Sequence, residues 1–211
     1  MTKQERRLTP QEQRRKERFL RLSEAMAAQG WRQRDLTVSV LAANLWGLVL
    51  TLPLAVLAGF LYCQWNPLPV PAFSMAETLL LFPVLLVLIV LHEGIHGLTW
   101  GCFAPSRLRA IEFGVIWKAL MPYCTCAEPL TKRQYLLGCL MPTLVLGFGL
   151  SAAAAALGSP CLFSLSAIMI LSGGGDVLIA WKLLLHRAPD AEVRYLDHPY
   201  ECGLVAFERP R

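Results

Sequence analysis

The chain has 211 residues, of which 55% are hydrophobic and 17% are charged, and its formal net charge is +5. This composition excludes an average soluble protein and makes an integral membrane protein the expected class. The basic excess does not indicate a nucleic-acid partner, because no basic motif interleaved with aromatic residues accompanies it.

The first expected element is an amphipathic helix from Pro10 to about Gln29. The stretch Thr9-Pro10-Gln11-Glu12 has the pattern of a capping box with Pro at the first helical position, and Gly30 is a typical stop. Basic residues crowd most of this helix, while one face carries Phe19, Leu22 and Met26. Two interpretations stay open: the helix lies on the anionic inner leaflet of the lipid bilayer, or it is a solvated basic helix that only fixes topology.

Four windows of mostly apolar residues follow, each long enough for a helix to cross a hydrocarbon core, which takes about 20 residues. They run approximately over residues 38–62, 75–101, 135–157 and 161–185. The first window is not a cleaved signal peptide, because a long polar segment precedes it and its apolar run is too long.

Lysine and arginine fall on alternate sides of these windows. Ten lie in residues 1–35, five in residues 107–133 and five from residue 182 onward, whereas the two remaining loops carry none. By the positive-inside rule, both termini and the loop with residues 107–133 are cytoplasmic, in a multi-pass protein of the cell membrane. The expected domains are a cytoplasmic N-terminal helix (1–35), a four-helix transmembrane domain (36–186) and a cytoplasmic tail (187–211) that is partly ordered at most.

The expected fold class is therefore an all-α integral membrane protein with four transmembrane helices. One stretch differs: residues 107–120, RLRAIEFGVIWKAL, partly alternate polar and apolar side chains as a strand does. A short β-hairpin in the cytoplasmic loop is expected there. Cys124-Thr-Cys126 is a weak signal for a metal site without a second pair, and the seven cysteines are expected to be reduced.

His92-Glu93-Gly94-Ile95-His96 has the HExxH pattern and closes a strongly apolar run. On a helix its two histidines lie one turn apart on one face, so both imidazoles can reach one ion at about 2.0–2.1 Å. Glu93 then lies beside the ion, where it can act as general base. Zinc (Zn²⁺) is the expected ion, because it accepts mixed nitrogen and oxygen ligands and lowers the pKa of a bound water to about 7.

The alternative is that the three groups are simply buried and bonded to neighbouring helices. Each unpaired ionisable group at membrane depth costs about 2.5–3.5 kcal/mol even on a lenient scale, so three together are hard to sustain without a compensating partner.

A catalytic zinc site normally has three protein ligands, so a third must come from elsewhere. Asp176 is the only acidic residue within the fourth apolar window. Counting residues to the cytoplasmic ends of the two helices places it within a few ångströms of the depth of His92 and His96. Four other residues are less well placed to be the third ligand. Glu77 lies toward the outer face, His186 and His198 lie past the last window, and Cys102 lies beyond the motif.

With these residues identified, the chain resembles the bacterial putative zincin peptidase family of small multi-span membrane proteins, related to site-2-protease-type intramembrane metalloproteases. The resemblance rests on HExxH near the end of a span, Tyr123-Cys124, Pro142, Gly175-Asp176 and Asp197. It implies proteolysis of a membrane-protein or peptide substrate, with His92, His96 and Asp176 as zinc ligands and Glu93 as base. Site-2 proteases usually place the aspartate in a Leu-Asp-Gly type motif, whereas glycine and valine flank Asp176 here.

Two further functions stay open at the level of sequence. The His/Glu/Asp cluster could form the ion site of a zinc- or proton-handling transporter, although four spans without a repeat are few for an alternating-access carrier. The chain could also be a non-catalytic scaffold of the same fold, but a scaffold would not need the base Glu93. A membrane-embedded zinc metallopeptidase that cleaves near the cytoplasmic side is the favoured function.

Overall fold

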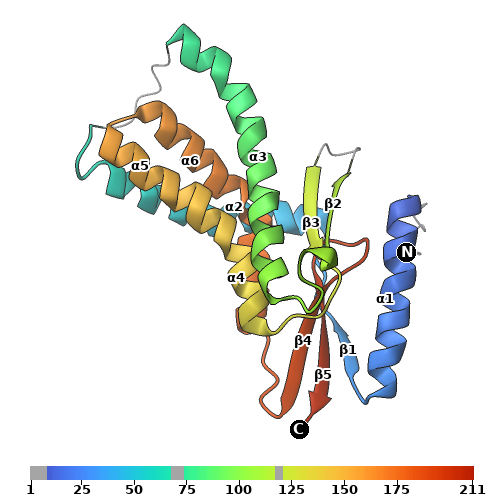
Figure 1. Ribbon diagram of the computed structural model, residues 1–211. Helices are drawn as coiled ribbons and strands as arrows, with labels where there is room; N and C mark the ends of the chain where they lie inside the picture. Colours follow the sequence, from blue (N-terminus) through green and yellow to red (C-terminus); the bar gives the residue numbers. More distant parts are fainter. Residues whose placement is uncertain (1–8, 68–73, 117–120) are drawn as a thin grey trace.

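Apolar helices and short strands lie in two different regions of the molecule (Figure 1). The structure is a computed structural model that describes residues 9–67, 74–116 and 121–211. Three segments lie outside the described residues: residues 1–8, residues 68–73 and residues 117–120, the last of which includes Lys118.

The helical region follows the four apolar windows. Its elements are α2 (Val40–Tyr62), α3 (Met75–Phe103), α4 (Lys132–Pro142), the π-helical η2 (Thr143–Gly149), α5 (Leu150–Leu157), α6 (Pro160–Ser172) and α7 (Gly174–Leu185). Within the described residues, three stretches are long and apolar enough to cross a membrane, 40–62, 75–103 and 132–157, and α6 with α7 supplies a fourth if this bent pair counts as one span.

Helix starts are set by local side chains, as the sequence predicts for α1 (Pro10–Ala28). Thr9 and Glu12 form its capping box, and Gly30 ends it with a positive φ of 84°. Ser74 with Glu77 caps α3 in the same way, and Thr131 with Gln134 caps α4. Because each cap satisfies backbone N–H groups within one turn, these boundaries depend on the nearby sequence alone.

The fourth window is not one straight helix. It breaks at Gly173, where α6 and α7 meet at 47°. Three successive glycines weaken the helix here, because glycine costs about 1 kcal/mol relative to alanine in a helix interior. The break also lets α7 cross α2 closely: a Cβ on Gly47 would lie 2.8 Å from the carbonyl carbon of Gly174. This contact holds the first turn of α7, which carries Asp176, inside the bundle.

The C-terminal segment is an ordered part of the fold, so the expectation of a partly ordered tail is wrong. It forms β4 (Ala191–Asp197) and β5 (Leu204–Pro210), which pair with β1 (Arg32–Asp35) in an antiparallel sheet of order β1-β5-β4. The expected all-α class is therefore too simple. The apolar patch in β5 explains the order, because Val205 and Phe207 are fully buried, with at most 1% of each exposed.

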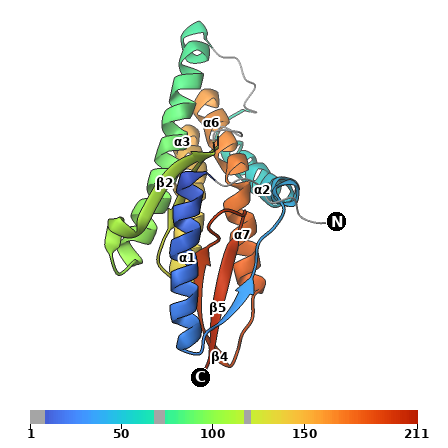
Figure 2. The same ribbon diagram turned by 90° about the vertical axis from the view of Figure 1, so that its right-hand side faces the viewer.

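The N-terminal helix α1 packs its apolar face on this sheet (Figure 2). Phe19, Leu22 and Met26 contact the cluster formed by Trp31, Leu196, Val205 and Phe207. The apolar stripe that could have entered a lipid surface is thus occupied within the chain, whereas basic residues remain on the rest of the helix. Attachment of those residues to an anionic leaflet stays a prediction.

The expected β-hairpin is present in the loop after α3. Following η1 (Arg107–Ala110), β2 (Ile111–Ile116) pairs antiparallel with β3 (Met121–Cys126). The hairpin lies alongside α3 (Figure 1) and packs its Phe113 ring where Gly97 leaves room, since a Cβ on Gly97 would lie 2.6 Å from that ring. From its other side, α1 contacts the hairpin through Arg18, whose guanidinium lies 2.7 Å from the Glu112 carboxylate.

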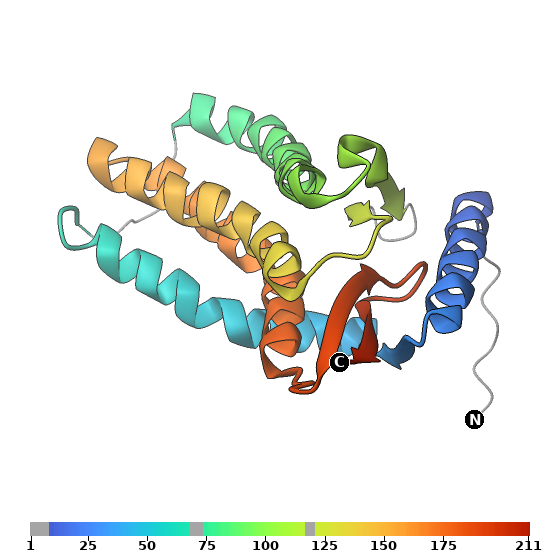
Figure 3. The same cartoon turned by 60° about the horizontal axis from the view of Figure 1, so that its bottom comes forward.

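The segments rich in basic residues gather at one end of the helices (Figure 3). The helix α1, the three-stranded sheet and the C-terminus lie there, and the C-terminal ends of α2 and α5 lie at the opposite end. This arrangement agrees with alternate loops facing alternate sides. The orientation in a cell membrane stays a prediction.

Candidate metal centre

The HExxH histidines lie on the inner face of α3, one turn apart. Both side chains are buried, with relative exposures of 8% for His92 and 3% for His96. Asp176 in the first turn of α7 approaches the same point, with 22% of its side chain exposed. The structure thus brings together the three residues that sequence reasoning singled out as ligands, and these three could hold a metal ion.

Three candidate ligand atoms form a nearly equilateral triangle. The His92 Nε2 lies 3.1 Å from Asp176 Oδ2 and 3.2 Å from His96 Nε2, and the His96 Nε2 lies 3.3 Å from Asp176 Oδ2. Around a tetrahedral zinc with bonds of about 2.0–2.1 Å, two ligand atoms are separated by about 3.3 Å. The spacing of these residues therefore fits a zinc ion without rearrangement of the helices.

The protonation of His96 gives a second reason for a cation at this point. Its Nδ1 lies 2.8 Å from the carbonyl oxygen of Gly138, which can only accept, so the Nδ1 carries a proton. In the neutral ring the Nε2 then presents a lone pair to the Asp176 carboxylate oxygen 3.3 Å away. Two acceptors facing one another are unfavourable unless a proton or a metal cation lies between them. A histidine bonded to a backbone carbonyl through its second nitrogen is also the usual arrangement of a metal ligand.

Glu93 follows His92 on α3 and is half-buried. It contributes no atom to the group of three, and the backbone N–H of Cys124 in β3 faces its carboxylate. The strand β3 therefore flanks the candidate base, and a carboxylate here is held beside the metal group without belonging to it.

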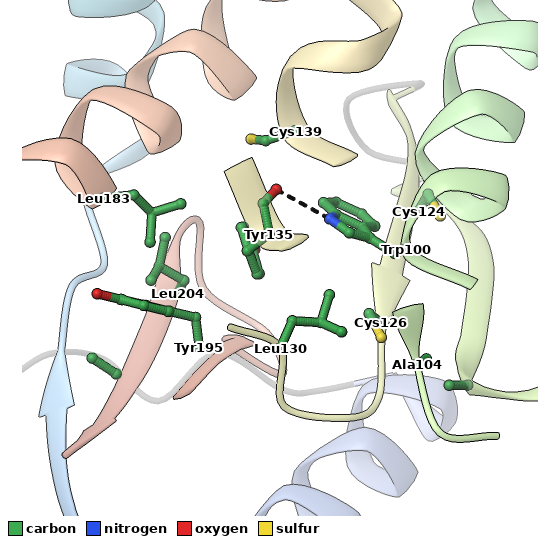
Figure 4. Close-up of a cluster of buried hydrophobic side chains, with 12 residues drawn as sticks. Trp100, Ala104, Cys124, Cys126, Leu130, Tyr135, Cys139, Leu183, Tyr195 and Leu204 are labelled. Atoms are coloured by element: carbon green, nitrogen blue, oxygen red, sulfur yellow. Dashed lines mark hydrogen bonds between the residues drawn. The ribbon is translucent and has the colours of Figure 1, made fainter. Parts of the chain in front are cut away.

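The walls of the centre come from α3 and α4. The Trp100 indole stacks on the His96 ring with centroids 5.0 Å apart and planes at 13°. Its Nε1 donates to the carbonyl oxygen of Tyr135 at 3.2 Å, which is the dashed line in Figure 4. Gly138 is required by this packing, because a Cβ there would lie 2.0 Å from the Trp100 Nε1. One turn of α4 thus supports His96 directly through Gly138 and indirectly through Trp100.

The rivals for the third ligand have other contacts. Glu77 caps the start of α3, and His186 bonds to Tyr195 and to Glu208. His198 accepts from the backbone N–H of Glu201, and Cys102 is exposed. None of them belongs to a metal-binding group among the described residues.

The Cys124-Thr-Cys126 pair is not part of the centre either, as far as the described residues show. Both thiols are buried in β3. Burial raises the pKa of the Cys126 thiol to about 12 and raises that of Cys124 further. Protonated thiols are poor metal ligands, so these side chains act as small apolar groups in the packing of the hairpin.

Over the residues that the structure describes, the protein is mainly helical, and three or four of its helical stretches are suited to a membrane. It also holds a group of two histidines and one aspartate with metal-ligand spacing. The chain belongs to the family described as "Putative zincin peptidase", whose model matches residues 85–190. The matched segment contains HExxH and Asp176 and ends directly before β4. No curated protein and no solved structure matches the chain. Family and geometry together indicate a zinc metallopeptidase.

Proposed function

We propose that this protein is a membrane-embedded zinc metalloendopeptidase that hydrolyses a peptide bond of a membrane-associated substrate near the cytoplasmic side. His92, His96 and Asp176 hold the ion, and Glu93 is the general base. The triangle of ligand atoms with edges of 3.1–3.3 Å supports this proposal most directly.

In this proposal the zinc ion and the protein side chains have different roles in the chemistry. A zinc ion in such a site supplies Lewis-acid activation of water near neutral pH. The Glu93 carboxylate lies next to a ligand without ligating, so it can take a proton from that water and pass it to the leaving amine. The His96 Nδ1–H bond to Gly138 keeps the imidazole in the tautomer whose Nε2 faces the ion.

A membrane location is supported by the surface of the helices. Large apolar side chains are exposed along α2 and α3, with 59% of Trp46, 68% of Phe82 and 70% of Val90 accessible. A soluble monomer rarely exposes so continuous an apolar surface, whereas a lipid-facing helix requires it. The metal group lies at the inner side of these helices, near the end where the basic segments gather.

An extended substrate can pair with the outer edge of β2. The Phe113 carbonyl oxygen faces away from β3, because the Gln11 side chain of α1 reaches it at 3.5 Å. In an antiparallel strand the N–H of a residue points to the same side as its carbonyl, so the Phe113 N–H also faces outward. Backbone pairing there would unwind a substrate helix and present its peptide bonds. Phe113→Pro removes this N–H, and Phe113→Ala is the matched control that keeps it. Equal cleavage rates of the two variants would exclude pairing at this edge.

The test of the function compares the wild type with Glu93→Gln, both purified in detergent. We expect one zinc per chain in both proteins, because the substitution leaves the three ligands intact. Cleavage of candidate membrane substrates should fall by about 10²–10⁴-fold in the variant, the usual contribution of a general base.

Three results would overturn the proposal. Equal cleavage by the two proteins would show that the activity comes from elsewhere. Zinc flux through liposomes without cleavage would favour the transporter, and partner binding without cleavage in both proteins would favour the scaffold.

A further inference from the structure

Two carboxylates meet the same edge of β3, at alternate residues. The backbone N–H of Cys124 faces Glu93, and the backbone N–H of Cys126 donates to Asp197 Oδ2 at 2.8 Å. Residues two apart in a strand direct their N–H groups to the same side, so one edge of β3 serves both carboxylates. Glu93 is the candidate base in α3. Asp197, the last residue of β4, belongs to the C-terminal sheet and has no part in the chemistry proposed above.

The second oxygen of Asp197 binds the helix that supports the metal group. The Tyr135 hydroxyl in the first turn of α4 donates to Asp197 Oδ1. Tyr135 is buried, with 1% exposed, and its backbone carbonyl accepts from Trp100, which stacks on His96. One turn later, the Gly138 carbonyl accepts from His96 itself. A single carboxylate thus joins β3, which flanks the base, to the turn of α4 that orients a ligand.

We propose that Asp197 is a positioning residue of the metal centre. It fixes β3 and the first turn of α4 relative to each other, and through them the orientation of His96 and the place of Glu93. It is not a ligand, because it lies outside the group of three. This inference rests on the proposed function for its role in catalysis, but its effect on metal binding can be measured without any substrate.

The packing explains why a carboxyl side chain, and not an apolar one, connects β3 to α4. An apolar side chain at this position would leave both the Cys126 N–H and the Tyr135 hydroxyl without acceptors, which is unfavourable for buried donors. Asparagine can keep a partner for each of these groups, because its oxygen accepts from the backbone N–H and its amide N–H donates to the hydroxyl oxygen, so that this second bond is reversed. Alanine keeps neither.

The experiment measures zinc affinity by competition with a chromogenic chelator in detergent, for the full-length wild type, Asp197→Ala, Asp197→Asn and Tyr135→Phe. The control is Glu208→Ala, which removes a carboxylate of the same sheet whose partner is His186, at 2.9 Å. Melting temperature is recorded for every protein, so that a general loss of stability is separated from a loss of affinity.

We expect Asp197→Ala to weaken zinc binding about 10–100-fold, the usual effect of removing a residue that orients a metal ligand. Tyr135→Phe should weaken it in the same direction, and Asp197→Asn should restore affinity close to the wild type. Glu208→Ala should lower the melting temperature and leave the affinity of the folded protein unchanged.

The outcomes separate this inference from the function on which it rests. If the wild type binds zinc and Asp197→Ala binds it equally well, Asp197 is not a positioning residue and the metallopeptidase proposal stands. If Glu208→Ala loses affinity as strongly, the effect is general destabilisation of the sheet and this inference fails. Absence of zinc binding by the wild type would overturn both proposals, whereas zinc binding without cleavage would overturn the function alone.

Discussion

Replacement of Gly138 by alanine tests whether the wall of α4 sets the geometry of the metal centre. A Cβ at this position would lie 2.0 Å from the Trp100 Nε1 and 2.2 Å from its Cδ1. Ordinary contacts between such atoms begin at about 3.5 Å, so the indole has to move by more than about 1 Å. It is only 4% exposed and lies between the His96 ring and the Tyr135 carbonyl, so it cannot move without disturbing both.

The expected cost follows from three contributions. Alanine gains about 1 kcal/mol over glycine in a helix, whereas overpacking costs about 1–3 kcal/mol. Loss of the buried Trp100 N–H bond costs about 1–3 kcal/mol more. The net destabilisation is about 3 kcal/mol, which lowers the melting temperature of a chain of this size by about 6–12 °C. Because His96 shares the same wall, zinc affinity should fall about 10–100-fold as well.

The assay is chelator competition for zinc together with thermal unfolding in detergent. The matched control is Gly175→Ala, because a Cβ on Gly175 meets no atom within 4 Å although the residue adjoins Asp176. This control should keep its zinc and be as stable as the wild type or slightly more so. Wild-type zinc affinity in Gly138→Ala would refute the reasoning that Trp100 and the Gly138 carbonyl fix His96.

Three further predictions concern metal linkage, pH and the junction of sheet and helices. Zinc at a hundredfold excess over its Kd should stabilise the wild type by about 2.7 kcal/mol. Asp176→Ala should abolish that gain in thermal unfolding, and an equal gain would exclude Asp176 as a ligand. Burial raises the pKa of Asp197 above its ordinary value of 3.8, so its contribution to stability is present below that pH and is lost as pH rises through the folded pKa. Asp197→Asn, which cannot ionise, should therefore gain in melting temperature relative to the wild type as the pH rises above 3.8, and a constant difference would contradict this. Lys182→Met should cost about 1–2 kcal/mol, because the Lys182 ammonium donates to the carbonyl oxygens of Leu36 and Thr37 where β1 leads into α2. Chemical denaturation measures this loss, and an unchanged midpoint would show that water replaces the ammonium.

Elements with a strong local signal could be predicted from the sequence. The helix α1 is delimited by its capping box and by Gly30. The apolar windows match the helical stretches 40–62, 75–103 and 132–157, because mean hydropathy is a property of neighbouring residues. The β-hairpin after α3 was also detectable from alternation of polar and apolar residues.

The three-stranded sheet could not be predicted in the same way. All four residues of β1 are exposed, and its sequence RQRD has neither alternation nor β-branched residues. This strand exists because its backbone pairs with β5, with Arg32 opposite Glu208. Pairing between segments so far apart in the chain depends on backbone hydrogen bonds, which every sequence can make, and on the tertiary fold that brings the two edges together.

The metal centre, too, was only partly predictable from the sequence. The sequence by itself determined that His92 and His96 share a face and that Glu93 lies beside them, because a helix of 3.6 residues per turn leaves no other arrangement. Counting residues to the ends of the two helices also placed Asp176 at the membrane depth of the two histidines. Only the tertiary structure decided that a broken helix brings this aspartate within 3.1 Å of His92, and that Gly138, Trp100 and Asp197 surround the group. These supports act largely through backbone carbonyls and N–H groups, which are the same at every residue and therefore carry no signal in a sequence.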